Sequence, residues 1–226
     1  MAAAKHLRFS IEGGREVSAL LLLPPKPKYL LVLGHGAGAG MNHPFMEKLA
    51  DELAAVSVAT FRYQFPYMEE RRRAPDAPAV LTATVAAAVR TASEAAPKLP
   101  LFAGGKSMGG RMTSQAAALG LLDDVKGLVF FGFPLHPPKR LDTKRAEHLA
   151  KVKQLMLFLQ GTRDTLADLK LLRPVLAKLD SRATLHIIET ADHSFHVLKS
   201  SKKTDEEVMR ELAETTAAWA QKITGR

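Results

Sequence analysis

Residues 99–119 read LPLFAGGKSMGGRMTSQAAAL, and this stretch decides the fold. A short apolar run passes through glycines into a segment of small residues with the hydrophobic spacing of a helix. Ser107 stands at the bend, inside the pattern Gly-x-Ser-x-Gly formed by residues 105–109. A strand that reverses sharply into a helix leaves no room for β-carbons two residues either side of the bend, and glycine removes that obstacle. The stretch therefore predicts a strand, a tight turn at Ser107 and a helix.

Ser107 is the candidate nucleophile. In the arrangement called a nucleophile elbow, the serine lies at the N-terminus of a helix, where backbone N–H groups face any developing negative charge. The five-residue pattern also arises by chance, so an inert serine in a glycine-rich turn is the alternative. The strand before the bend and the helix after it favour the nucleophile elbow.

The composition is typical of a globular protein. The 226 residues are 46% hydrophobic and 24% charged, which predicts one domain spanning residues 1–226. No apolar run has the length of a membrane span, and residues 1–8 lack the hydrophobic core of a secretory signal, so we expect a cytoplasmic protein with no membrane partner. The absence of cysteine excludes disulfides, thiolate metal sites and a cysteine nucleophile.

The net charge of +9 admits a nucleic-acid interface, a solvated basic surface or an attraction for anionic substrates. The basic residues are scattered along the chain instead of forming a recognisable binding motif, so we expect no nucleic-acid partner. The clusters are Arg71–Arg73, Lys139–Arg140, Lys144–Arg145 and residues 199–203.

The chain alternates apolar strands with helix-like segments. Residues 7–11 and 17–23 flank two glycines and predict an antiparallel hairpin. This alternation predicts an α/β fold, with a mostly parallel eight-stranded sheet covered by helices on both faces and ligands bound outside the carboxyl ends of its strands. The further expected strands are 29–33, 56–61, 99–103, 127–132, 155–159 and 184–188, and the expected helices are 42–53, 78–96, 108–119, 142–153, a segment ending at 179, and a last one capped by Thr204 and Glu207.

A glycine-rich loop, GHGAGAG at residues 34–40, follows the third strand. Acyl-transfer sites need a backbone N–H donor beside the one that follows the nucleophile, so Ala37 and Met108 are the candidate pair and Gly36 a neighbouring contact. We expect His35 to be structural. Aromatic and apolar side chains in later loops are candidate walls of a substrate site, although an ordinary capped surface loop is the alternative. They are Phe65, Tyr67 and Leu135.

Three strand ends carry Ser107, Asp164 and His193, in the chain order serine, acid, histidine that α/β-hydrolases use. Competing residues exist for the last two positions. Asp168 is expected to cap the following helix, and Asp192 adjoins His193, where neighbouring side chains diverge. His136 and His196 are the competing bases.

The chain resembles the α/β-hydrolase superfamily, and in particular its small members similar to dienelactone hydrolases. The stretches FPYMEERRRAPD, GGKSMGGRM, FPLHPP, EHL, LQGTRD and ADHSF look like the branch of the testis-expressed hydrolase-like protein and the hydrolase-like domain of a chromatin nonspecific-lethal complex subunit. A serine stands where dienelactone hydrolases have a cysteine, so their substrate does not carry over.

The resemblance implies roles for the site residues. Ser107 would attack an acyl carbonyl, His193 would move the proton and Asp164 would fix the imidazole tautomer, with Ala37 and Met108 as oxyanion donors. It requires no cofactor, and we see no metal-ligand spacing.

We therefore expect a serine hydrolase that cleaves a small acyl ester, or a thioester or amide. A catalytically weak scaffold or binding module with the same fold is the alternative, and the sequence leaves a homo-oligomer open. Only a short segment separates Gly132 from Leu155, which predicts an open site without a large helical cap, suited to short acyl chains.

Overall fold

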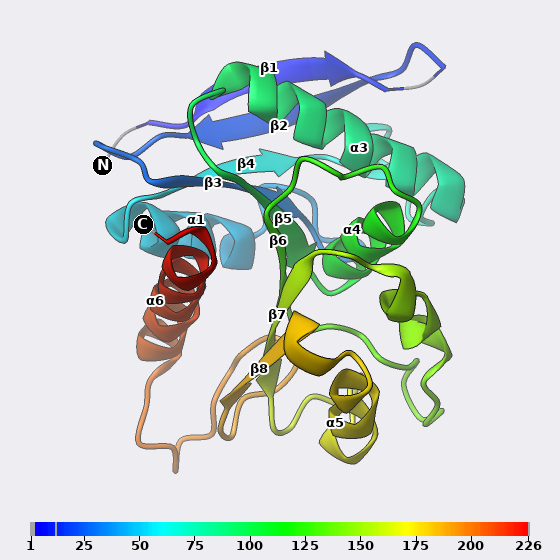
Figure 1. Cartoon of the computed structure of the whole chain (residues 1–226), viewed down its shortest axis with the longest axis vertical. Coiled ribbons are helices and arrows are strands. Elements are labelled where there is room, and N and C mark those ends of the chain that lie inside the picture. The colour runs from blue at the N-terminus through cyan, green and yellow to red at the C-terminus, as the bar shows by residue number, and fades with distance from the viewer. Residues whose placement is uncertain (1–2, 12, 226) are drawn as a thin grey trace.

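A computed structural model describes residues 3–11 and 13–225, so Glu12 of the predicted hairpin turn and both ends of the predicted domain lie outside the described residues. Its centre is an eight-stranded sheet in the order β1-β2-β4-β3-β5-β6-β7-β8 (Figure 1). The strands are β1 Lys5–Ser10, β2 Glu16–Leu22, β3 Tyr29–Gly34, β4 Val58–Tyr63, β5 Leu101–Lys106, β6 Gly127–Phe131, β7 Leu155–Gly161 and β8 Ala183–Ile188.

The sheet is mostly parallel. β3 to β8 run parallel to one another, whereas β2 pairs antiparallel with both β1 and β4. The predicted N-terminal hairpin is confirmed as β1 and β2, and the predicted mostly parallel eight-stranded sheet is confirmed with it. Strands β3, β4 and β6 are buried along their whole length, as continuous apolar runs require in a sheet covered on both faces.

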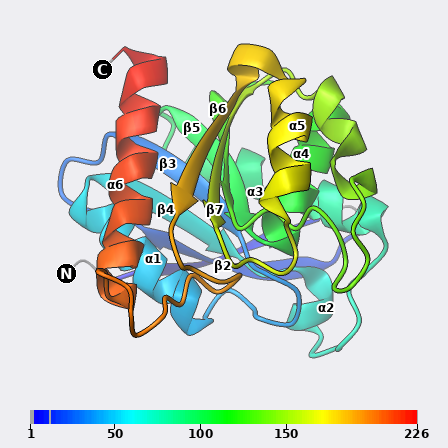
Figure 2. The ribbon, with the colours of Figure 1, turned by 90° about the horizontal axis from the view of Figure 1, so that it is seen from below.

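Helices cover both faces of the sheet. α1 and α6 pack on one face, and α3, α4 and α5 pack on the other (Figures 1 and 2). Each layer closes its own hydrophobic core against the sheet. The α-helices are α1 Pro44–Ala55, α2 Pro66–Glu69, α3 Pro78–Ala95, α4 Met108–Ala118, α5 Leu169–Ala177 and α6 Asp205–Thr224, and the short 3-10 helices are η1 Lys144–Lys151 and η2 Asp180–Arg182.

Several helical segments differ from the sequence prediction, including α2 and η2, which lie where no helix was expected. α1 is capped by His43 instead of Asn42, because the His43 Nδ1 atom accepts the Phe45 N–H at 3.2 Å. The predicted amphipathic helix 142–153 is the shorter 3-10 helix η1. Arg182 donates hydrogen bonds to the carbonyl oxygens of Ala150 and Val152, so a side chain satisfies the carbonyls that close this segment.

The last helix, α6, begins as predicted. Thr204 and Glu207 form a reciprocal capping box, and Trp219 lies over the sheet with its ring 5.9 Å from that of Phe102. No helix in the described part of the chain is both long and apolar enough to cross a membrane.

Because Trp219 is 7% exposed and packs on Phe102, we expect Trp219→Ala to lower the free energy of unfolding by about 3–5 kcal/mol. Urea unfolding measures this change. The control is Leu141→Ala, a side chain that is 65% exposed, which should change stability by at most about 0.5 kcal/mol. A loss below about 1 kcal/mol for Trp219→Ala would contradict the packing role.

Candidate active site

Ser107 lies in a strained turn between β5 and α4. Its φ of 51° and ψ of −115° are unusual for a residue with a side chain. A Cβ at Gly105 or at Gly109 would lie less than 3.0 Å from backbone atoms of Gly34 in the neighbouring strand. Glycine is therefore required at both flanking positions, for the steric reason that the sequence pattern indicated.

The three candidate side chains meet at the carboxyl ends of their strands. The His193 Nε2 atom lies 2.9 Å from the Ser107 Oγ atom, and the His193 Nδ1 atom lies 2.7 Å from the Asp164 Oδ2 atom. Both distances are those of hydrogen bonds. β5 presents the serine, the turn after β7 presents the aspartate, and the loop after β8 presents the histidine. The arrangement can pass a proton from the hydroxyl to the imidazole while the carboxylate faces the other ring nitrogen.

Asp164 is held by more than the histidine. Its side chain is fully buried; Oδ2 accepts a hydrogen bond from Gln160 Nε2 at 2.5 Å, and Oδ1 accepts the Leu166 N–H at 2.8 Å. Gln160 is itself fixed, because its Oε1 atom accepts the Phe133 N–H at 3.0 Å. These donors satisfy a buried carboxylate and orient it toward the Nδ1–H of His193.

Sequence reasoning missed Gln160. The signal was a buried polar residue at the end of an otherwise apolar strand, LMLFLQG.

The two competing aspartates accept hydrogen bonds from backbone N–H groups near their own positions in the chain. Asp168 caps α5 by accepting the Lys170 N–H at 2.7 Å, as predicted. Asp192 accepts the backbone N–H groups of Ser194 and His196 through one oxygen, at 2.8 and 3.0 Å. Neither carboxylate makes a hydrogen bond to His193 in the described part of the chain.

The competing histidines are also occupied elsewhere. The Nε2 atom of His136 accepts the Asp168 N–H at 3.1 Å, and its Nδ1 atom lies 3.0 Å from the Pro137 carbonyl. His196 pairs with Asp205 at 2.6 Å on an exposed surface. Among the described histidines, His193 is the one that contacts Ser107.

The candidate oxyanion donors lie beside the serine. Met108 is the first residue of α4, and Ala37 belongs to the glycine-rich loop on the wall of the same pocket. Neither backbone N–H donates to another group in the described part of the chain, so both are free to face a ligand oxygen.

The glycine-rich loop is braced from below by the segment after β4. His35 is buried; its Nδ1 atom lies 2.7 Å from the Gly36 carbonyl, and its Nε2 atom accepts the Phe65 N–H at 3.1 Å. The Tyr67 hydroxyl accepts the Gly38 N–H at 2.9 Å. His35 is thus structural, as expected.

The predicted substrate walls require a correction. Phe65, Tyr67 and Leu135 are fully buried in the core and do not line the pocket. The aromatic loop folds inward because its residues support the glycine-rich loop instead of facing solvent. The sequence could not distinguish these two directions.

The pocket at Ser107 has a volume of about 330 Å³. Gly36 and Ala37 line it, and its apolar walls come from Phe45 and Met46 of α1 and from Leu166 after Asp164. The available signal was the position of α1 directly after the glycine-rich loop. The full lining is Gly36, Ala37, Ala39, His43, Phe45, Met46, Lys106, Ser107, Leu166, His193 and Ser194.

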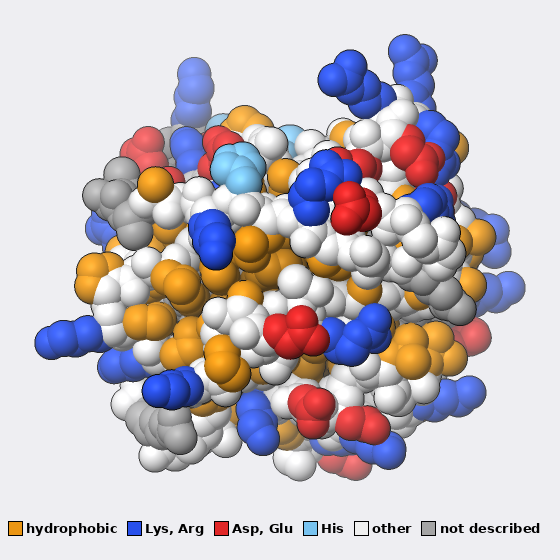
Figure 3. All heavy atoms as spheres, turned by 90° about the horizontal axis from the view of Figure 1, so that it is seen from above, with side chains coloured by type: hydrophobic (Ala, Val, Ile, Leu, Met, Phe, Trp, Pro, Cys, Tyr) orange, Lys and Arg blue, Asp and Glu red, His pale blue; other side chains and the backbone are white. Residues whose placement is uncertain are grey.

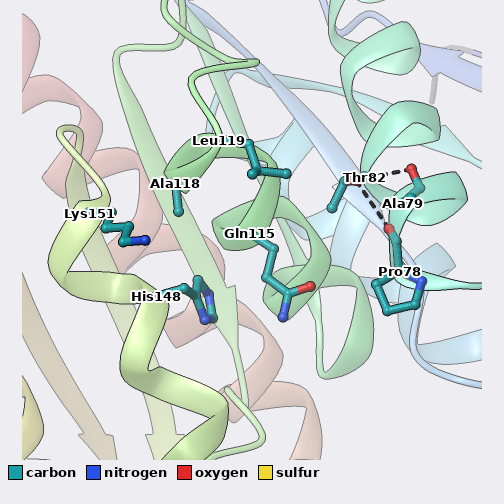
Figure 4. Close-up of a pocket in the computed structure, with 8 residues that line it drawn as sticks. All are labelled: Pro78, Ala79, Thr82, Gln115, Ala118, Leu119, His148 and Lys151. Carbon is teal, nitrogen blue, oxygen red and sulfur yellow. Dashed lines mark hydrogen bonds between the residues drawn. The ribbon is translucent and has the colours of Figure 1, made fainter.

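A second hollow, of about 380 Å³, lies between α3, α4 and η1 (Figure 4). His148 on its rim lies 2.7 Å from the Ser114 Oγ atom, which makes a second serine–histidine pair. The Ser114 hydroxyl also donates to the Arg111 carbonyl at 2.8 Å. No carboxylate of the described residues pairs with His148, so this pair lacks the acid that the Ser107 site has.

The surface charges are dispersed. Figure 3 shows lysine and arginine side chains spread over one face with aspartate and glutamate among them. Within the described residues, no group of three or more histidine, aspartate and glutamate side chains could hold a metal ion.

The fold and the serine–histidine–aspartate geometry together define the class of α/β serine hydrolases. Residues 27–221 match the model of the "Alpha/beta hydrolase domain" family, and the chain belongs to this family.

Several solved structures are similar to this fold. A serine hydrolase without a lid from Xanthomonas campestris superposes with a TM-score of 0.75 at 18% identity, covering 97% of this chain and 96% of that one. A dienelactone hydrolase from Anabaena variabilis superposes with a TM-score of 0.75 at 19% identity, covering 96% of this chain and 95% of that one. An esterase domain from Rhodothermus marinus superposes with a TM-score of 0.72 at 17% identity, covering 97% of this chain and 98% of that one. At these identities the likeness establishes the fold.

Burial lowers the pKa of His35 from 6.5 to about 4, mainly through desolvation, with His43 lowering it further and the bond to Gly36 raising it. Between these two pH values the unfolded chain binds a proton that the folded chain does not. The contribution of His35 to the free energy of unfolding is therefore fully present above pH 6.5. It is lost as the pH falls toward 4, by about 3 kcal/mol.

We expect His35→Gln to reduce the fall in unfolding free energy between pH 6.5 and 4 by about that amount in urea titrations. Leu141→Ala provides the control, because this exposed side chain carries no titratable group and its loss should leave the pH dependence of the wild type unchanged. Equal pH dependences for wild type and His35→Gln would contradict the assignment.

Proposed function

We propose that the protein is a serine hydrolase that cleaves a small acyl ester, with a thioester or amide as the less favoured substrate. The observation that carries the proposal is the continuous chain of hydrogen bonds from Ser107 through His193 to the buried Asp164. No other described serine, histidine and carboxylate are joined in this way.

The geometry supports an acyl-enzyme mechanism. The Ser107 hydroxyl gives its proton to His193 Nε2 while its oxygen bonds to the acyl carbonyl carbon, and the carbonyl electron pair moves to oxygen. The backbone N–H groups of Ala37 and Met108 would stabilise this oxyanion. As the electron pair returns, the bond to the leaving oxygen breaks, and the imidazolium protonates that oxygen. Water then repeats the sequence on the acyl-serine and releases the acid.

Asp164 contributes by holding the imidazole. Its carboxylate accepts the Nδ1–H of His193, so Nε2 keeps the lone pair that takes the serine proton. The same negative charge stabilises the imidazolium that forms in each half of the reaction. Gln160 and the Leu166 N–H keep the carboxylate in place.

The ester preference rests on the small open site and on the relatives. The similar solved structures include an esterase domain from Rhodothermus marinus and a cold-adapted esterase from an Arctic intertidal metagenomic library. A pocket of about 330 Å³ with apolar walls suits a short acyl chain. We further propose that the chain belongs to the branch resembling the testis-expressed and nonspecific-lethal-complex hydrolase-like proteins, on the motifs described above, and that it acts without a cofactor.

The proposal requires that Ser107→Ala abolish hydrolysis of p-nitrophenyl butyrate and labelling by a fluorophosphonate, with the far-UV circular dichroism unchanged. Loss of a true nucleophile costs several powers of ten in rate. Ser114→Ala is the matched control, because Ser114 pairs with His148 away from this pocket, and it should retain the wild-type rate within about threefold. More than about a tenth of the rate remaining in Ser107→Ala, or no labelling of the wild type, would favour a scaffold.

The assignment of the acid predicts that Asp164→Asn lowers kcat by about 10⁴, since an amide cannot fix the same imidazole tautomer or stabilise its charge. Asp168→Asn and Asp192→Asn should change kcat by less than about fivefold, because these residues cap a helix and a turn. Steady-state kinetics on folded variants decide the question. A large loss in Asp192→Asn with a small one in Asp164→Asn would reverse the assignment.

A further inference from the structure

Lys106 lies directly before Ser107 and lines the same pocket. Its ammonium group lies 5.6 Å from the ring centroid of Phe45 and 5.7 Å from that of Phe195. These two rings are stacked on each other, with their centroids 5.9 Å apart. The ammonium is therefore held beside an aromatic pair at the wall of the candidate active site.

This ammonium has no counter-ion in the described part of the chain. No hydrogen bond or ion pair joins its Nζ atom to a carboxylate or carbonyl oxygen among those residues. Asp164 and Asp192 attract it from a distance without pairing with it. Both Asp164 oxygens accept hydrogen bonds from other groups, and Asp192 Oδ1 accepts two backbone N–H groups. The positive charge is consequently left for a group that enters the pocket.

Lys106 is half-buried, and removing part of the water from its ammonium group is costly without compensation. Desolvation lowers the pKa of Lys106 to about 8, against the opposing effect of Asp164 and Asp192, so the side chain still carries its charge at pH 7. Contact with aromatic faces offsets only part of this cost. An apolar side chain would fill the same space against Phe45 and Phe195 at lower cost, which indicates that the charge itself has a use.

We propose that Lys106 is a specificity-determining residue that binds a carboxylate on the substrate, so that the preferred substrate of this site is an ester carrying a second, negatively charged group. The inference rests on the proposed function. A substrate carboxylate supplies the counter-ion that no described residue provides to Lys106. The net charge of +9 attracts such anions to the protein. His43 on the same pocket wall uses Nδ1 to cap α1, and this leaves its Nε2 available to the ligand.

The kinetic test compares two pairs of esters at pH 7. The p-nitrophenyl monoester of glutaric acid is compared with p-nitrophenyl valerate, which places the carboxylate on the acyl side. The acetyl ester of 4-hydroxybenzoic acid is compared with phenyl acetate, which places it on the alcohol side. Ratios of wild type to variant for each ester remove differences in intrinsic reactivity.

In at least one pair, wild type should prefer the anionic ester, and Lys106→Met should lower kcat/KM for that ester at least tenfold. The neutral partner should change less than threefold, and Lys106→Arg should restore most of the preference. The matched control is Lys48→Met on α1, an exposed lysine, which should leave the preference within twofold of wild type. If Lys106→Met does not fold, Lys106→Gln replaces it, and the same tenfold loss of kcat/KM for the anionic ester is expected.

A binding measurement separates this inference from the proposed function. Calorimetry on Ser107→Ala with monoethyl glutarate should show binding that weakens at least tenfold when Lys106→Met is added. Binding that depends on Lys106 without any hydrolysis by the wild type would overturn the hydrolase proposal and the substrate role of Lys106 with it, and would leave Lys106 as a carboxylate-binding residue only. Hydrolysis that depends on Ser107 but shows no preference for anionic esters, or a preference unchanged in Lys106→Met, would overturn the role of Lys106 alone.

Discussion

The close approach of three backbone segments at the nucleophile turn is the constraint on which the rest of the structure depends. Gly105 and Gly109 pass so near Gly34 that neither tolerates a β-carbon. This contact joins β3, β5 and α4, and it forces Ser107 into a conformation with positive φ. Because the turn is locked by packing on both sides, the strained serine is held in one position at the edge of the sheet.

The parallel topology then brings the other groups to the serine. β5, β6, β7 and β8 are consecutive neighbours whose carboxyl ends lie on one edge, so the loops after β7 and β8 reach the nucleophile without a long connection. The histidine and aspartate are far apart in sequence but 2.7 Å apart in space. Gln160, at the end of β7, converts the buried aspartate from a desolvated charge into a satisfied one, and this keeps the proton-transfer geometry rigid.

The site also contains a polar group that this network does not use. Lys106 lies at the end of β5, directly before Ser107. Its ammonium group faces two aromatic rings and the pocket instead of a carboxylate. The second serine–histidine pair, Ser114 and His148, shows the opposite case, in which a suggestive pair is internally satisfied and has no acid. The two serine–histidine pairs differ in their third partner, because His193 pairs with the buried Asp164 whereas His148 pairs with no carboxylate of the described residues.

The sequence by itself determined the order of strands and helices, the glycine requirement around Ser107 and the strand ends that carry Asp164 and His193, because these depend on local spacing and on the rule that parallel strands share a carboxyl edge. Only the tertiary structure decided which side chains near the carboxyl edge of the sheet face the pocket. Phe65, Tyr67 and Leu135 turn inward, and Phe45, Leu166 and Lys106 form the walls. The direction of a loop side chain is set by packing between segments distant in sequence, on which local patterns carry no information.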